Sequence, residues 1–144
     1  MGIFRNQKER AAAIGQVAIF SGLSQADLMA IQRHSTESTL PKGSELAVQD
    51  RAPTQMLILI HGSAIVRRNN RKLATLGPGD TIGELSLLDG GKQTATVVAD
   101  SEVGVLVVSV SEFRTLLADS PGFTQKMLKS LAGHLRQANS HLAP

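Results

Sequence analysis

The sequence predicts an α+β fold that is mainly β: an antiparallel jelly-roll β-barrel flanked by N-terminal and C-terminal helices. Short runs typical of strands fill the middle of the 144-residue chain, with Gly62, Gly77 and Gly79 among the residues that separate them. Helical periodicity is confined to the two ends, and no helix-length insert divides the runs as a parallel sheet would require. We expect one domain over 1–144, with helices in 1–36, the barrel in 37–109 and helices in 110–142.

The N-terminal region is expected to form two helices. Residues 5–17 are rich in alanine, and a second helix is expected to start at Ser24, because Asp27 follows three residues later as in a helix-start signature. Phe20 and Leu23 are expected to fix the turn between the two helices.

The barrel is expected to use six runs that alternate or are wholly apolar: ELAVQ, MLILIHG, AIVRR, KLATL, TATVVA and VGVLVVSV. The densest basic segment, RRNNRK at 67–72, lies between two of these runs. We interpret it as a solvated hairpin turn.

The C-terminal helices have clear start signals. Ser109 and Glu112 form a capping-box pair, and Ser120 with Pro121 supplies a cap and a first-turn proline for the last helix. In that helix a stripe repeats in steps of three and four at Leu128, Leu131, Leu135, Ala138 and Leu142. The stripe can lie on the barrel or pair with a second chain, so a homodimer through this helix is one of two open alternatives.

The composition excludes several function classes. The chain has no Cys, which rules out disulfides and thiolate metal sites and favours a cytoplasmic location. No apolar segment approaches the roughly 18 residues of a membrane span. The aromatic residues amount to 3%, all Phe, so nucleic acid is not an expected partner. His34, His61, His134 and His141 are scattered, and we expect no metal site, no cofactor and no enzyme activity.

The stretch TIGELSLLDGGKQTATVVA at 81–99 carries the functional signal. Taken alone, Thr81 and Glu84 form a capping box at the start of a short helix. Gly83 favours another interpretation, because a glycine at a helix start leaves backbone amides open to an anion. A carboxylate there would repel an anion unless it accepted hydrogen bonds from a sugar hydroxyl. The combination therefore suits a ribose phosphate ester.

These motifs resemble the cyclic nucleotide-binding domain of bacterial cAMP-responsive regulators, cAMP-dependent kinase regulatory subunits and gated channels. The resemblance rests on IFSGLSQADLMAI, MLILIHGSAIV, LGPGDTIGELSLLDGG and SEFRTLLADSPGFTQKMLKSLAGHLRQAN, and LGPGDTIGELSLLDGG is similar to the family's phosphate-binding cassette, expected here over 81–96. It implies that backbone groups of Gly83, Leu85 and Ser86 face the cyclic phosphate and that Glu84 binds the ribose 2′-OH. It also implies that Thr94 touches the phosphate or the base and can favour cGMP, and that Leu135 or Arg136 is a candidate lid.

The sequence departs from the family at its most informative position. The Arg that pairs with the phosphate is replaced by Gln93, and the Pro before it by Lys92. A charge-assisted contact contributes about 1.5–3 kcal/mol, so its loss is expected to weaken binding by roughly tenfold to a hundredfold. Neighbouring strand residues face opposite sides, so we expect Gln93 to face the pocket and donate an amide hydrogen bond while Lys92 faces solvent.

Two functions follow. The first is a non-catalytic regulatory domain in signal transduction that binds cAMP or cGMP and signals through its C-terminal helix. The alternative is a degenerate, nucleotide-independent module that keeps the fold and binds an unknown protein partner, because Gln93 has replaced the phosphate-binding Arg.

Overall fold

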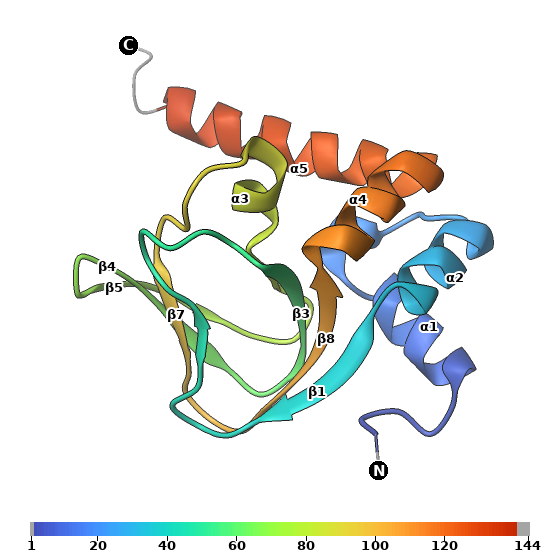
Figure 1. Cartoon of the computed structure of the whole chain (residues 1–144), viewed down its shortest axis with the longest axis horizontal. Coiled ribbons are helices and arrows are strands. Elements are labelled where there is room, and N and C mark those ends of the chain that lie inside the picture. Colours follow the sequence, from blue (N-terminus) through green and yellow to red (C-terminus); the bar gives the residue numbers. More distant parts are fainter. Residues whose placement is uncertain (1, 141–144) are drawn as a thin grey trace.

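The computed structural model describes residues 2–140 and arranges the strands in two four-stranded sheets, with helices gathered beside them (Figure 1). The N-terminal elements are α1 (Gln7–Gly15), the 3₁₀ turn η1 (Ala18–Phe20) and α2 (Gln25–Arg33). The strands are β1 (Thr36–Leu40), β2 (Glu45–Ala47), β3 (Gln55–His61), β4 (Ala64–Arg68), β5 (Arg71–Leu76), β6 (Thr81–Ile82), β7 (Thr96–Ala99) and β8 (Val103–Ser109). Helix α3 (Glu84–Asp89) lies between β6 and β7, and α4 (Val110–Asp119) and α5 (Pro121–Ser140) follow β8.

The sheet topology confirms the predicted antiparallel jelly roll. One sheet has the order β1-β8-β3-β6 and the other β2-β7-β4-β5, and all the pairings are antiparallel. The strands form two stacked sheets instead of one closed barrel. The six predicted runs correspond to six of these strands, whereas β1 and the two-residue β6 were not among them.

The sheet that contains β3 and β8 is buried on both faces. On β3, Leu57 and Leu59 pack into the core between the two sheets, while Met56 and Ile58 pack against the helices. Strand β8 divides its residues between the same two clusters. Two-sided burial explains why these strands are continuous apolar runs instead of alternating ones.

The basic segment 67–72 forms the tight hairpin turn that the sequence predicted. Asn69 and Asn70 link β4 to β5 with φ angles of 51° and 64°, a conformation that Asn tolerates better than most residues. In Figure 1 this hairpin projects from the left edge of the molecule.

Capping side chains set the starts of three helices. Asn6, Ser24 and Ser109 accept hydrogen bonds from the backbone N–H groups of Glu9, Asp27 and Glu112. The helix starts predicted at Ser24 and Ser109 are therefore confirmed, while α1 is shorter than the predicted 5–17.

The joint between α4 and α5 is fastened to α2 by a polar contact, which we call the Asp27 latch. The Asp27 carboxylate accepts hydrogen bonds from the hydroxyl groups of Ser120, at 2.6 Å, and Ser24, at 2.8 Å. Of these two bonds, the one from Ser120 does more to lower the pKa of Asp27 below its ordinary value. Ser120 is itself buried between the two helices.

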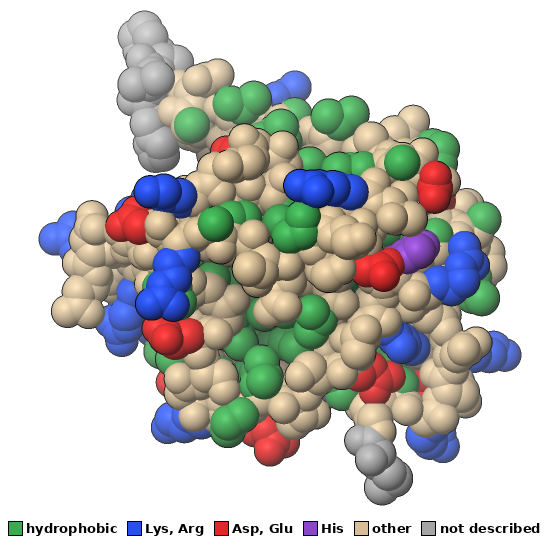
Figure 2. Space-filling model, viewed as in Figure 1, with side chains coloured by type: hydrophobic (Ala, Val, Ile, Leu, Met, Phe, Trp, Pro, Cys, Tyr) green, Lys and Arg blue, Asp and Glu red, His purple; other side chains and the backbone are tan. Residues whose placement is uncertain are grey.

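Helix α5 buries a different face from the one that its leucine stripe suggested. Phe123 and Met127 are fully buried, whereas Leu128 and Leu135 are 60% and 57% exposed. At these two leucines the stripe does not lie on the barrel, because the aromatic cluster of the helices takes the Phe123 face instead. Apolar side chains are visible over α5 in Figure 2. Leu142 and His141 lie outside the described residues.

Candidate functional site

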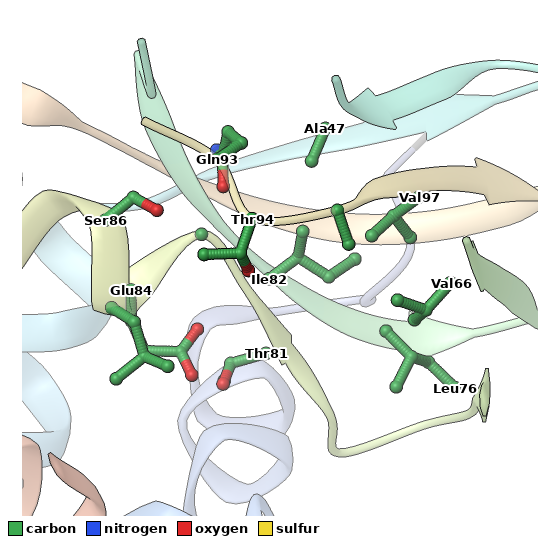
Figure 3. A pocket seen from close by; sticks show the side chains of 13 residues that line it. Ala47, Val66, Leu76, Thr81, Ile82, Glu84, Ser86, Gln93, Thr94 and Val97 are labelled. Atoms are coloured by element: carbon green, nitrogen blue, oxygen red, sulfur yellow. The ribbon is translucent and has the colours of Figure 1, made fainter. Parts of the chain in front are cut away.

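A cavity of about 190 Å³ opens between the β6–α3 segment and the sheet that contains β4 and β7. Its wall combines the six predicted site residues with apolar residues from the strands: Ala47, Val66, Leu76, Thr81, Ile82, Gly83, Glu84, Leu85, Ser86, Gln93, Thr94, Ala95 and Val97. In Figure 3 the polar side chains of Thr81, Glu84, Ser86 and Gln93 lie on one side and the apolar Val66, Leu76 and Val97 on the other. The cavity therefore has a polar end and an apolar end.

Gly83 makes the sharp turn from β6 into α3. Its φ is +94°, and an added Cβ would lie 2.8 Å from the carbonyl oxygen of Gln55. Both facts require glycine at this position. Gly83 is also the N-cap of α3, without a side-chain capping bond. The alternative interpretation of Thr81 and Glu84 as a capping box is therefore not correct, because Thr81 lies in β6 and pairs with Ile58 of β3.

The start of α3 presents backbone donors to the cavity wall. The first helical hydrogen bond runs from the Leu87 N–H to the Gly83 carbonyl at 3.2 Å. The amides of residues 84–86 precede it and have no acceptor within the helix. The buried Ser86 hydroxyl donates to the Lys92 carbonyl at 3.1 Å, which ties α3 to the loop that follows it.

Glu84 is the unusual side chain of the site. It is 8% exposed and lines the cavity, and Figure 3 shows its carboxylate on the polar side beside Thr81. Within residues 2–140 no hydrogen bond or ion pair to this carboxylate is found. The carboxylate faces the open cavity, so it can accept hydrogen bonds from a molecule placed there.

Gln93 and Lys92 face opposite sides, as the sequence predicted. Gln93 lines the cavity and its Nε2 atom lies 3.4 Å from the point that a Cβ on Gly83 would occupy, while Lys92 is exposed. The backbone of Gln93 is held by two 2.8 Å bonds to the turn at Asp50 and Arg51. Asp50 adopts a φ of 69°, which Asp tolerates better than most residues.

The six predicted site residues lie together, whereas the candidate lid residues do not. Gly83, Glu84, Leu85, Ser86, Gln93 and Thr94 all line one cavity, although their contact with a ligand stays a prediction. The candidate lid residues Leu135 and Arg136 are not part of its wall. Sequence reasoning missed the apolar wall of Val66, Leu76 and Val97, which strand alternation could have placed on one face.

Residues 2–140 contain no group of three potential metal-ligating side chains. None of the helices in that range combines the length and apolarity that a bilayer crossing requires.

Comparison with known proteins gives a consistent result. The sequence model of the cyclic nucleotide-binding domain matches residues 37–120, more than half of the chain. The CRP-like cAMP-activated global transcriptional regulator of Mycobacterium tuberculosis is 26% identical over 135 residues, which cover 90% of this chain and 60% of that protein. A cyclic nucleotide-gated potassium channel of Rhizobium etli is 27% identical over 117 residues, or 81% of this chain and 33% of the channel.

A solved structure of similar sequence identity shares the fold. The crystal structure of the Thermus thermophilus catabolite activator protein superposes with a TM-score of 0.78 at 27% identity, covering 86% of this chain and 61% of that one. The chain thus spans less than two thirds of the length of each of these relatives.

Proposed function

The chain belongs to the cyclic nucleotide-binding domain family, and from that premise we propose that it is a non-catalytic regulatory module that binds cAMP or cGMP beside α3. The ligand occupies the cavity of about 190 Å³, and α5 reports its presence. Because the matched relatives are longer than this chain, the effector that receives the signal is outside the proposal.

The observation that carries the proposal is the unpartnered, buried carboxylate of Glu84. The residue is 8% exposed and its side chain lines the open cavity, so hydrogen-bond donors from a ligand can reach the carboxylate without competing for it with another protein group. A ribose 2′-OH is such a donor. The free amides of residues 84–86 lie beside it and suit the neighbouring cyclic phosphate.

The apolar end of the cavity suits a nucleobase. Val66 and Val97 pair across β4 and β7, and Leu76 ends β5 beside them. The base would rest on these aliphatic side chains, while Thr94 at the opening offers a hydroxyl to the phosphate or the base.

Signalling through α5 is supported by the packing of α3. Leu87 and Leu88 of α3 pack against the same cluster that contains Phe113 of α4 and Met127 of α5. If the ligand binds more tightly when α3 is in one position than in another, it shifts the populations of the α5 positions that go with them.

The alternative is a degenerate module that binds a protein and no nucleotide. It is favoured by Gln93, since Glu84 is the only ionisable side chain in the cavity wall and no cation lies there. The exposed Leu128 and Leu135 would then form the surface for a protein partner or a second copy of the chain.

Calorimetric titration of cAMP and cGMP separates the two functions. We expect binding by the parent, and a loss of about tenfold or more in Glu84→Gln, because a hydrogen bond to a charged acceptor contributes about 1.5–3 kcal/mol. The matched control is Glu102→Gln, which removes an exposed carboxylate near the β7–β8 turn and leaves binding unchanged.

A second ligand tests the role of Glu84 directly. 2′-Deoxy-cAMP lacks the hydroxyl group, so it should bind the parent more weakly than cAMP does and lose nothing further in Glu84→Gln. The absence of heat from the parent with both cAMP and cGMP would reject nucleotide binding and select the degenerate module.

A further inference from the structure

The basic hairpin between β4 and β5 contributes one side chain to the face that lines the cavity. Val66 pairs with Val97, and both line the cavity, while the next pair, Arg67 with Thr96, faces outward. Alternation puts Arg68 on the same face of β4 as Val66, although Arg68 is not part of the cavity wall and lines a neighbouring hollow with Asn69, Arg71 and Leu73. The hairpin therefore places an arginine beside the site, outside its wall.

A hydrogen bond holds Arg68 in this position. Its Nε donates to the carbonyl oxygen of Thr94 at 3.0 Å, across 26 residues of sequence. Thr94 lines the cavity and directly follows Gln93, the position at which the family carries its phosphate-binding Arg. The guanidinium of Arg68 is thus bonded to the backbone of the residue that follows Gln93 in the sequence.

Most of the hydrogen-bonding capacity of Arg68 is unused. The bond to Thr94 occupies one of its five donors, and among the described residues no carboxylate forms an ion pair with it. The remaining donors form the planar fork that fits an anionic oxygen pair.

Two other cations lie near Gln93. Lys92 is exposed and is not part of the cavity wall, and its carbonyl is occupied by Ser86. Arg51 pairs with Gln93 through backbone atoms, and it lines a surface hollow that shares Ala47 and Gln93 with the cavity wall. Arg51 is therefore the competing cation that the experiment has to separate from Arg68.

We propose that Arg68 supplies the positive charge for the phosphate of the bound cyclic nucleotide, in place of the family Arg that Gln93 has replaced. This inference rests on the proposed nucleotide-binding function and assigns its anion-recognising side chain. The cation comes from the neighbouring hairpin instead of the cassette. From the sequence, the basic segment 67–72 was interpreted as a solvated turn. Under this proposal one of its residues, Arg68, binds the ligand.

Calorimetric titration of cAMP into arginine variants tests the assignment. Arg68→Gln is expected to weaken cAMP binding by about tenfold or more, since it removes a charge-assisted contact, and Arg68→Lys should retain part of the affinity. Arg67→Gln is the matched control, because it removes the same charge from the adjacent, outward-facing position. Arg51→Gln and Lys92→Gln test the competing cations, and both should bind as the parent does.

Adenosine serves as the probe without a phosphate. Its affinity should be the same for the parent and for Arg68→Gln, because the side chain acts on the anion alone. The inference would be overturned if Arg67→Gln and Arg68→Gln lost equal affinity for cAMP, or if Arg51→Gln or Lys92→Gln lost more. In either case, cAMP binding by the parent would still support the proposed function. A parent that binds no cAMP would overturn both.

Discussion

Replacing Gln93 with Arg restores a cation inside the cavity, at the position where the family pairs Arg with the phosphate. Gln93 already points into the cavity, close to the turn at Gly83, so an arginine there reaches the amides that start α3. The wall otherwise holds one ionisable side chain, the carboxylate of Glu84, and that charge opposes an anionic ligand. The substitution therefore changes the net charge of the wall from negative to neutral.

The size of the effect follows from the bond that is exchanged. A neutral amide bond contributes about 1 kcal/mol and a charge-assisted one about 1.5–3 kcal/mol, so the net gain is expected near 1.4 kcal/mol, or about tenfold in affinity. The gain should be larger in the Arg68→Gln background, where the substituted arginine is the only cation available to the phosphate.

Isothermal titration calorimetry with cAMP, cGMP and adenosine measures this gain. Lys92→Arg is the control, because it adds an arginine at the neighbouring, solvent-facing position. Thermal unfolding without ligand checks that Gln93→Arg leaves the fold intact. A cAMP dissociation constant within twofold of the parent value, or an equal gain with adenosine, would refute the electrostatic reasoning.

Three further predictions concern the fold around the site. Gly83→Ala should cost about 1–3 kcal/mol of unfolding free energy and abolish nucleotide binding, since alanine would be strained at a φ of +94° and clash with Gln55. Urea unfolding measures the stability and calorimetry the binding. A variant as stable as the parent would contradict the turn geometry. Asp27→Asn should destabilise the chain at neutral pH; because the pKa of Asp27 is lowered from 3.8 in the folded state, the difference should shrink as pH falls below 3.8 and disappear only below the folded-state pKa, and a pH-independent difference in urea unfolding would speak against the latch. If α5 pairs two chains, replacing both Leu128 and Leu135 with Lys should convert a dimer to a monomer in sedimentation velocity, and a monomeric parent would exclude that pairing.

Helix α3 connects the cavity to the Asp27 latch. Leu87 and Leu88 of α3 pack on the helical core, and the latch fastens the joint from which α5 extends. Under the proposed function, loosening the latch should therefore alter the signal from α5 more than the affinity of the cavity.

Much of the candidate site could be predicted from local signals. Gly83 and Glu84 predicted a site for a ribose phosphate ester, the family resemblance added Leu85, Ser86, Gln93 and Thr94, and all six candidate residues line one cavity. Alternation at 92–93 predicted which of the two side chains faces inward. These features depend on a few neighbouring residues, because turn geometry and strand periodicity are set by local backbone preferences.

The sequence by itself determined the order of the helices and of six strands, the caps at Ser24 and Ser109, and the position of the cassette, since each depends on residues a few places apart. Only the tertiary structure decided that Thr81 is a strand residue instead of a cap, that α5 buries Phe123 and not its leucine stripe, and that Arg68 lies against Thr94. The physical reason is that these outcomes depend on which distant segments meet. A helix with two apolar faces buries the one that its neighbours cover, and a side chain 26 residues from the cassette reaches it through strand pairing alone.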